Sequence, residues 1–384
     1  MNLFEVYLTF SLNLERGFGT FLFDKEGNSY LDFYGGHAVL SIGHSHPFYV
    51  KTLKKQLSKI GFYSNVVKIT KQKELTKKIG IISGYENYKL FLCNSGAEAI
   101  ENALKIASFH NNKKKVVAFK GSFHGRTSAA VSITDNPKIV APLNDQHSRI
   151  FLDLGDEKSL IAELKSEEVC AVITEGIQGV SGIVNTGVDF LKNLLRNCHR
   201  YKVPLIIDEI QSGYGRSGYF FAHQAANIRP DLITIAKGMG NGLPIAGVLI
   251  SPQFKAFYQM LGTTFGGNHL ASIAALSVLT VIKKEEIIVN VWSIGSIAIK
   301  HLKKVPQIKN ISGSGLILGI SFDFTVLPLK ESLFYKENVF VGTSSNQLIL
   351  RLLPPLNISN IEMHFFIKKL QNALANIEND LSSI

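Results

Sequence analysis

Short continuous runs of apolar residues, separated by helical segments, occupy the chain from about residue 48 to residue 250. Continuous rather than alternating apolar strands are typical of a parallel sheet that is covered on both faces. The pattern therefore predicts an α/β domain with a mostly parallel sheet of about seven strands. The runs are Leu90–Cys93, Val116–Phe119, Ile150–Leu152, Val169–Thr174, Leu205–Asp208, Leu232–Ala236 and Gly247–Ile250.

Helical spacing of apolar positions marks several segments between and beside these runs. Phe48–Ile60 and Lys71–Ile82 have this spacing, and a helical region extends from His269 to about Lys304. One further segment carries the apolar stripe of a helix that packs on a sheet. The residues of this stripe are Phe190, Leu191, Leu194, Leu195 and Cys198.

Both ends of the chain have a different pattern. Phe21–Phe23 and Ser29–Phe33 flank a Gly-Asn pair that suits a hairpin turn. Beyond residue 305, short strands are expected within Leu316–Phe324 and Leu348–Leu353, before a terminal helix over Ile361–Asn379. We therefore expect an N-terminal arm (1–47) that joins a small α+β domain (291–384), and a large domain (48–290) between them.

The composition is that of a globular protein. The 384 residues are 46% hydrophobic and 18% charged. No apolar run approaches the roughly 20 residues that span a bilayer. The N-terminus lacks a basic head followed by an uninterrupted apolar stretch, so we expect no signal peptide and no membrane partner. These features predict a cytoplasmic protein.

Metal and nucleic-acid functions have little support. Cys93, Cys170 and Cys198 are far apart, and no third ligand accompanies His44 and His46, so no metal site is expected. The formal net charge is +11, but the lysines are distributed mostly as ones and twos and form no basic stripe with interleaved aromatic residues. The positive charge is interpreted as a solvated surface, and no nucleic-acid partner is expected.

A candidate phosphate site follows the first strand of the predicted sheet. Ser95 and Glu98 have the spacing of a capping box at the start of a helix. The small residues Gly96 and Ala97 leave backbone N–H groups accessible at the positive end of this helix. An ordinary capped helix is the alternative interpretation.

A second glycine-rich stretch, GYGRSG at 213–218, matches the dinucleotide fingerprint G-x-G-x-x-G. The residues after it show little sign of a helix, and Asp231 lies too close to serve as the acidic residue of that motif. A nicotinamide-dependent oxidoreductase is therefore the weaker alternative.

Two polar residues end neighbouring apolar runs. Asp208 follows Val203–Ile207, and Lys237 follows Leu232–Ala236. A lysine, an acid and a phosphate-binding helix N-terminus together fit pyridoxal 5′-phosphate. The lysine bonds the aldehyde, and the acid keeps the pyridine nitrogen protonated, so that the ring withdraws electrons from the substrate.

The motifs NSGAEA, FHGRT, EGIQG, IIDEIQSGYGRSG, DLITIAKGMGNGLP, TTFGGN and LRLLPPL appear in the order seen in class III aminotransferases. From about residue 15 to 375 the chain resembles this family of pyridoxal-phosphate enzymes of fold type I. The resemblance implies a large domain with a seven-stranded sheet, a small domain, and a homodimer with active sites at the interface.

The resemblance also implies roles for single residues. Lys237 would bond the cofactor and later carry the proton as general base and acid, and Asp208 would pair with the pyridinium nitrogen. Gln211 would bind the ring hydroxyl, with Ile210 and Phe123 on the two ring faces. The phosphate would be bound by four residues: Ser95, Gly96, Ala97 and, from the neighbouring subunit, Thr264.

Substrate contacts are implied for four residues. Arg126 would hold the carboxylate far from the reacting amine, and Arg351 the α-carboxylate of 2-oxoglutarate or glutamate, because a guanidinium binds a carboxylate with two parallel hydrogen bonds. Thr263 would lie beside the substrate. His37 occupies a pocket-wall position that is tyrosine in ornithine-specific members, which argues mildly against unacylated ornithine.

The chain departs from the family pattern at several positions. Many members read EPIQGEGG where residues 175–182 read EGIQGVSG, so that Val180 replaces a glutamate that can pair with the counterpart of Arg351. His269 stands where proline is common, and Ser312 replaces a frequent arginine. In the family, this glutamate lets one pocket accept the neutral end of one substrate and the carboxylate of the other. Its absence puts that switch in doubt, but not transamination itself.

The leading hypothesis is an aminotransferase that moves the δ-amino group of N2-acetylornithine or N2-succinylornithine to 2-oxoglutarate, in arginine biosynthesis. The products would be an N-acyl-glutamate semialdehyde and glutamate. A broader ω-aminotransferase for ornithine, 4-aminobutyrate or a diamine is the alternative. A non-catalytic basic binding protein with the same fold is a more remote alternative.

Overall fold

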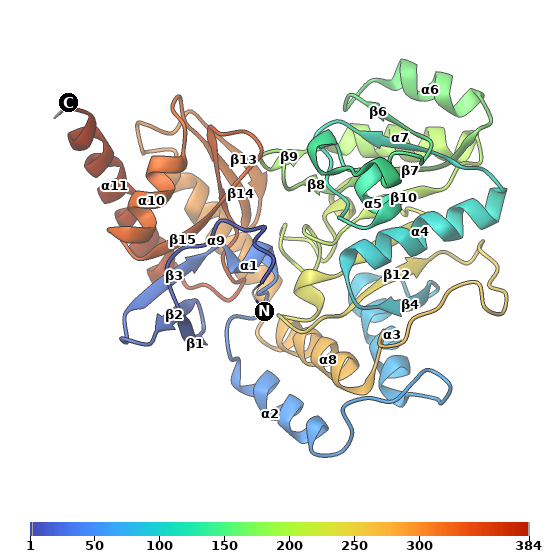
Figure 1. Cartoon of the computed structure of the whole chain (residues 1–384), viewed down its shortest axis with the longest axis horizontal. Helices are drawn as coiled ribbons and strands as arrows, with labels where there is room; N and C mark the ends of the chain where they lie inside the picture. Colours follow the sequence, from blue (N-terminus) through green and yellow to red (C-terminus); the bar gives the residue numbers. More distant parts are fainter. Residues whose placement is uncertain (2, 383–384) are drawn as a thin grey trace.

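Two seven-stranded sheets organise the fold, and Figure 1 shows them in the right and left halves of the view. The structure is a computed structural model that describes residue 1 and residues 3–382. The larger sheet has the order β4-β12-β11-β10-β7-β5-β6. Its strands are β4 (Lys89–Cys93), β5 (Lys115–Phe119), β6 (Arg149–Leu152), β7 (Val169–Glu175), β10 (Leu205–Asp208), β11 (Leu232–Ile235) and β12 (Ala246–Ile250).

The seven strands of the larger sheet are those that the apolar runs predict, and the mostly parallel sheet is confirmed. Only β12 runs antiparallel to both of its neighbours, β11 and β4. The other pairs are parallel. The predicted α/β architecture with a mostly parallel sheet is thereby confirmed.

Helices cover both faces of this sheet, which explains the continuous apolar runs. Neighbouring residues of one strand enter different cores: Val116 packs with helix α4 (Gly96–Asn111), and Val117 packs with α6 (Glu157–Lys165) and α7 (Val188–Arg200). Three of the expected stripe residues, Leu191, Leu194 and Cys198, are buried on α7. A strand buried on both faces has no polar side to display.

The smaller sheet combines the two ends of the chain. Its order is β1-β2-β3-β15-β16-β14-β13, and the parallel pair β3–β15 joins the N-terminal strands to the C-terminal ones. The hairpin predicted around the Gly-Asn pair is β2–β3. The strands are β1 (Leu14–Phe18), β2 (Phe21–Asp24), β3 (Ser29–Phe33), β13 (Asn310–Ser314), β14 (Ile317–Ser321), β15 (Val339–Thr343) and β16 (Ile349–Leu352).

Two long helices connect the sheets: α8 (His269–Lys284) and α9 (Ile287–Leu302). Glu286, between them, has a left-handed backbone with φ of 50° and interrupts the helical region that the sequence predicts as one stretch. The expected domain boundary at residue 290 falls inside α9. No helix among the described residues is long and apolar enough to cross a membrane.

The remaining elements are short or peripheral. The other helices are α1 (Gly35–Ala38), α2 (Pro47–Leu57), α3 (Thr70–Ser83), α5 (Ser128–Ser132), α10 (Leu327–Tyr335) and α11 (Asn360–Ser382). A two-stranded ribbon is formed by β8 (Ile177–Gln178) and β9 (Val184–Asn185). Single 3-10 turns occur at η1 (Pro137–Ile139), η2 (Pro142–Asn144), η3 (Ala222–Ala226) and η4 (Lys237–Met239).

The glycine-rich stretch 213–218 is a loop that links the two sheets, not the start of a helix. The fully buried Arg216 donates hydrogen bonds to the carbonyl oxygens of Leu316 at 3.1 Å, of Leu40 at 3.3 Å, and of Pro354. A dinucleotide fingerprint requires a helix N-terminus directly after the glycines. The loop therefore has a structural role, and the oxidoreductase alternative loses its support.

Candidate active site

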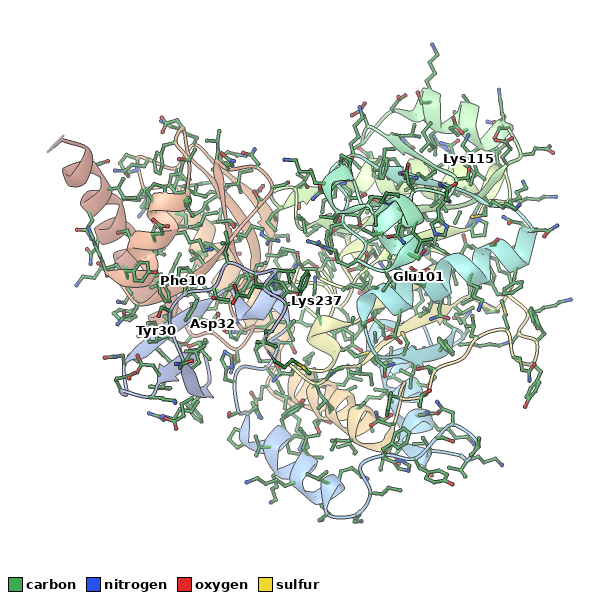
Figure 2. All side chains as sticks on the ribbon, in the orientation of Figure 1. Phe10, Tyr30, Asp32, Glu101, Lys115 and Lys237 are labelled. Atoms are coloured by element: carbon green, nitrogen blue, oxygen red, sulfur yellow. The ribbon has the colours of Figure 1, made fainter. Side chains whose placement is uncertain are left out.

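The candidate site lies at the carboxyl ends of the central parallel strands, where ligands bind in open α/β sheets. Asp208 ends β10 and Glu175 ends β7, and the two residues are partners in the parallel register. Lys237 follows β11, the next strand along the sheet. Figure 2 shows Lys237 between the two halves of the molecule.

A cavity of about 340 Å³ opens at this edge of the sheet. Every expected cofactor-binding residue except Thr264 lines it: Ser95, Gly96, Ala97, Phe123, Asp208, Ile210, Gln211 and Lys237. Val180 lines it too, and so do His124 and Glu175, which the sequence reasoning did not assign. The four expected substrate residues lie outside this lining.

The N-terminus of α4 forms one wall of the cavity. The Ser95 hydroxyl accepts the N–H of Glu98 at 3.2 Å, and the first N–H bonded within the helix is that of Ala99. The N–H groups of Gly96 and Ala97 are therefore left for a ligand. A Cβ at Gly96 would lie 2.9 Å from the Ile210 side chain, so a larger residue here would displace Ile210.

Asp208 is fixed from two sides. Its Oδ1 accepts the N–H of Ile210 at 3.0 Å, and its Oδ2 lies 2.8 Å from Nδ1 of the buried His124. Nε2 of His124 is buried without a hydrogen-bond partner. His124 belongs to the motif FHGRT, but no role was expected for it, because it lies 84 residues before Asp208 and meets it only in the fold.

The Lys237 side chain is buried, and the charges of two carboxylates act on it. Burial lowers the pKa of its ammonium to about 8, against the opposing effect of the carboxylates of Asp208 and Glu175. Its φ is +41°, an uncommon conformation for a residue other than glycine. A lysine that loses its proton near neutral pH is a nucleophilic amine, which fits a covalent bond to an aldehyde.

Glu175 is a second buried acid at the site. Its Oε1 accepts the N–H of Phe123 at 3.0 Å, and its Oε2 that of Gly179 at 2.9 Å. Desolvation, with an added effect from the charge of Asp208, raises the pKa of the Glu175 carboxyl to about 7. A signal for Glu175 is present in the sequence, since this acid ends an apolar strand as Asp208 does.

Gln211 is held by a left-handed turn of the small-sheet side. Its Nε2 donates to the carbonyl oxygen of His37 at 3.2 Å, while its Oε1 is buried without a partner. Gly35, Gly36, His37 and Ala38 all have φ between 55° and 67°. The turn therefore binds the Nε2 group of Gln211, and Oε1 is left to accept a hydrogen bond from a ligand.

Arg351 is 5% exposed, and two carbonyl oxygens accept its hydrogen bonds. Nε donates to Thr343 at 2.7 Å and Nη1 to Gly179 at 3.1 Å, and no carboxylate among the described residues forms an ion pair with it. Burial lowers the pKa of its guanidinium. A buried guanidinium at the edge of the site, without an acidic partner, is suited to bind a substrate carboxylate.

Two further expected substrate residues, Arg126 and Thr263, and the expected phosphate ligand Thr264 are more peripheral. Arg126 is exposed, with its guanidinium carbon 6.0 Å from the centre of the Phe123 ring. The hydroxyl of Thr263 accepts a hydrogen bond from the Asn94 side chain at 3.3 Å. Thr264 is exposed and lies outside the cavity of its own chain.

The cavity fits pyridoxal phosphate on its own observations. It combines a lysine that titrates near neutrality, a carboxylate fixed at a strand end, and open N–H groups at a helix N-terminus. The unpartnered Oε1 of Gln211 is available for a ring hydroxyl. These parts define a pyridoxal-phosphate enzyme of the α/β type.

Comparison with known proteins gives the family. The model of the family described as aminotransferase class-III matches residues 5–374, and the chain belongs to that family of pyridoxal-phosphate-dependent enzymes. The acetylornithine aminotransferase of Archaeoglobus fulgidus is 36% identical over 365 residues, 94% of this chain and 95% of that protein. The acetylornithine aminotransferase of Bacillus subtilis is 34% identical over 380 residues, 97% and 98% of the two chains.

Solved structures show the same fold. The ornithine aminotransferase of Toxoplasma gondii superposes with a TM-score of 0.91 and 26% identity, over 97% of this chain and 92% of that one. The acetylornithine aminotransferase of Elizabethkingia anophelis gives a TM-score of 0.83 and 28% identity, over 96% and 95% of the chains. The class of enzyme, its fold and its cofactor agree with the sequence-based predictions.

Proposed function

We propose that the enzyme transfers the δ-amino group of an N2-acylornithine to 2-oxoglutarate, giving an N-acyl-glutamate 5-semialdehyde and glutamate. The observation that carries this proposal is the set of relatives named acetylornithine aminotransferase, which are 34–36% identical over nearly the whole chain. The acyl group would be acetyl or succinyl, and the reaction would belong to arginine biosynthesis.

Bound pyridoxal phosphate supplies an electron sink that acidifies the substrate C–H bond next to the reacting nitrogen. We assign the phosphate to the N–H groups of Gly96 and Ala97 with the Ser95 hydroxyl, and the pyridine nitrogen to Asp208. His124, 2.8 Å from Asp208, orients that carboxylate. Phe123 and Ile210 would lie on the two ring faces.

Lys237 would hold the cofactor and then carry the proton. Its pKa of about 8 means that a fraction of the amine is neutral at neutral pH, so the same nitrogen can accept a proton from one carbon and return it to another. Gln211 would bind the ring hydroxyl through Oε1, while its Nε2 stays on the carbonyl of His37.

The substrate carboxylates would be bound by the two arginines. Arg351, buried and without an acidic partner among the described residues, suits the α-carboxylate of glutamate or 2-oxoglutarate. Arg126, exposed beside Phe123, would hold the carboxylate at the far end, with Thr263 nearby. His37 would line the substrate side of the site.

A second candidate is an ω-aminotransferase that uses free ornithine, 4-aminobutyrate or a diamine. It is supported by the likeness to the ornithine aminotransferase of Toxoplasma gondii, at 26% identity over 97% of this chain.

A donor panel on the holoenzyme separates these candidates. N2-acetylornithine, N2-succinylornithine, ornithine and 4-aminobutyrate are each assayed with 2-oxoglutarate, and we expect the highest kcat/KM for an N2-acylornithine. Faster turnover of free ornithine would overturn the proposal. Borohydride reduction followed by peptide mass analysis tests the site itself, and the cofactor mass is expected on Lys237.

We also propose a homodimer with shared sites. Thr264 is exposed and absent from the cavity of its own chain, which suits a contact to the phosphate of a partner subunit. The arm 1–47 and residues 291–384 would form the small domain and residues 48–290 the large one, and the working place would be the cytoplasm.

A further inference from the structure

The 3-10 turn η4, which begins at the left-handed Lys237, is held by side chains from outside it. The carbonyl oxygen of Gly238 accepts the hydroxyl hydrogen of Ser41 at 2.8 Å. The carbonyl oxygen of Gly240, directly after the turn, accepts that of Tyr49 at 2.7 Å, and both contacts are buried. A left-handed backbone is unfavourable for a residue with a Cβ, so surrounding contacts of this kind are needed to maintain it.

Asn241 bonds the same part of the backbone to a strap, which we define as residues 41–43. Its Oδ1 accepts the N–H groups of Ser41 at 2.8 Å and Ile42 at 2.9 Å, and its Nδ2 donates to the carbonyl oxygen of Gly43 at 2.9 Å. Asn241 is buried and has a φ of 48°, a conformation that asparagine adopts more readily than most residues. Because a side-chain amide carries both an acceptor and donors, this one residue pairs three backbone groups of the strap.

The strap is also bonded to the small-sheet side of the molecule. The N–H of Leu356 donates to the carbonyl oxygen of Ser41 at 3.0 Å. The backbone of His44, next to the strap, forms hydrogen bonds of 2.8 Å and 3.0 Å with Gly19. Leu356 follows β16, the strand of Arg351. The strap therefore connects η4 with the small sheet, which fixes the turn from both sides.

The strap contacts can affect the reacting nitrogen only through the backbone of the turn. Lys237 lines the cofactor cavity, whereas Ser41 and Asn241 lie outside its lining. A displacement of about 1 Å at a reacting group, caused by a change far from the chemistry, can lower a rate about 100-fold. A small change in η4 is therefore expected to slow proton transfer without altering a substrate contact.

We propose that Ser41 and Asn241 are positioning residues that hold Nζ of Lys237 in place for proton transfer. The inference rests on the role assigned to Lys237 in the proposed function, but not on the choice of amine donor. Without the Ser41 hydroxyl or the Asn241 amide, the left-handed turn relaxes. The nitrogen is then displaced from the carbons between which it carries the proton.

Ser41→Ala tests this role, because it removes only the hydroxyl that donates to Gly238. Asn241→Asp is the second variant, since it keeps the acceptor but places a carboxylate oxygen against the carbonyl oxygen of Gly43. Ser83→Ala is the matched control. Ser83 is 3% exposed, donates at 2.7 Å to a carbonyl oxygen one turn earlier in α3, and lies outside the cavity lining.

Steady-state kinetics of the holoenzyme use 2-oxoglutarate and the donor with the highest kcat/KM. We expect Ser41→Ala to lower kcat about tenfold or more, while the KM of each substrate changes by less than about twofold. With a donor deuterated at the carbon that bears the reacting amine, the isotope effect on kcat should rise, because proton transfer becomes slower relative to the other steps.

A second measurement needs no turnover. The cofactor absorbance of the resting holoenzyme is titrated with pH in the absence of substrate. Its apparent pKa is expected to shift by about half a unit in Ser41→Ala and Asn241→Asp, because the bond between Lys237 and the cofactor is held in a changed geometry. Ser83→Ala should leave both kcat and this pKa unchanged.

The outcomes separate this inference from the proposed function. Unchanged kcat and absorbance pKa in Ser41→Ala would overturn the positioning role. Equal changes in Ser41→Ala and Ser83→Ala would show a general structural effect and also count against it. Borohydride trapping of the cofactor on another lysine would overturn both proposals. A preference for free ornithine would overturn the proposed donor alone, because the kinetic test uses whichever donor reacts best.

Discussion

Val180 is the single residue with the largest consequence for how Arg351 is used. It lines the cofactor cavity, directly after Gly179, whose carbonyl oxygen accepts the Nη1 hydrogen of Arg351 at 3.1 Å. Among the described residues, no side-chain carboxylate forms an ion pair with this guanidinium. The arginine is therefore open to a substrate carboxylate in both halves of the reaction.

Val180→Glu is expected to weaken the binding of a substrate carboxylate to Arg351. A glutamate at 180 would pair with Arg351 and compete with the substrate, so the KM for 2-oxoglutarate should rise about tenfold, equivalent to about 1.4 kcal/mol. Steady-state kinetics with N2-acetylornithine as donor measure this change. Val180→Gln is the uncharged control of similar size, and an equal rise in both variants would contradict the electrostatic explanation.

Glu175 makes the stability of the apoprotein depend on pH. Its pKa is about 7 in the fold, against a reference value of 4.5, so the folded state binds this proton more tightly than the unfolded chain does. Between these two values the free energy of unfolding should therefore fall as the pH rises, by about 1 to 3 kcal/mol.

Urea unfolding of the apoprotein at pH 5 and pH 7.5 measures this slope. Glu175→Gln is expected to flatten it, whatever the absolute stability of the variant, because the titrating group is removed. Other ionisable groups affect both proteins alike and cancel in the comparison. An unchanged pH slope in the variant would place the responsible group elsewhere.

At the scale of elements, the left-handed turn 35–38 connects the small sheet to the cofactor cavity. Its backbone is held by the buried Asp32, and its His37 carbonyl holds Gln211. Left-handed conformations cost residues with a Cβ about 1 kcal/mol or more, so the surrounding contacts maintain this turn.

Gly36→Ala tests this coupling without a steric clash. A Cβ at Gly36 would lie 3.6 Å from Leu40, an ordinary contact, so the penalty arises from the φ of +55° alone. We expect a loss of about 1 kcal/mol in stability and weaker binding of pyridoxal phosphate, measured by fluorescence titration of the apoprotein. Gly36→Asn tolerates this conformation better and should lose less of both. Unchanged cofactor affinity in Gly36→Ala would mean that the turn does not position Gln211.

The elements that the sequence predicts best are those whose burial decides their composition. All seven strands of the larger sheet are continuous apolar runs, because helices cover both faces. β13, with the sequence NISGS, was missed since a half-exposed strand needs few apolar residues. The antiparallel direction of β12 has no local signal either, because direction follows from the connection between strands.

In the candidate site, too, some residues have a local sequence signal and others are recognised only in the fold. Asp208 and Lys237 were found from the sequence because a polar residue at the end of a buried strand is unusual there. The contact of His124 with Asp208, and that of His37 with Gln211, join residues 84 and 174 positions apart. Only the fold brings such pairs together, and their local sequence carries no sign of it.

At the scale of the whole molecule, exposed apolar side chains gather on two loops that contact each other. The rings of Phe62 and Phe265 are 5.2 Å apart, and both are exposed, by 42% and 59%. Asn65 donates to the carbonyl oxygen of Gly266 at 3.2 Å and fixes the two loops together. Thr264, the residue proposed to reach a partner's phosphate, lies in the second loop. We therefore place the interface of the proposed homodimer on this exposed apolar surface.

The double substitution Phe62→Asp with Phe265→Asp is expected to convert the proposed homodimer to monomers, because it places two charges per subunit on the surface that the proposed interface would cover. Sedimentation equilibrium measures the mass, and fluorescence titration measures cofactor affinity, which should fall about tenfold or more as the phosphate loses the partner's Thr264. Ile361→Asp, at a residue of α11 that is 82% exposed, is the matched control and should change neither quantity. A wild-type protein that sediments as a monomer with full cofactor affinity would contradict the shared site, and a dimer that survives the double substitution would place the interface on another surface.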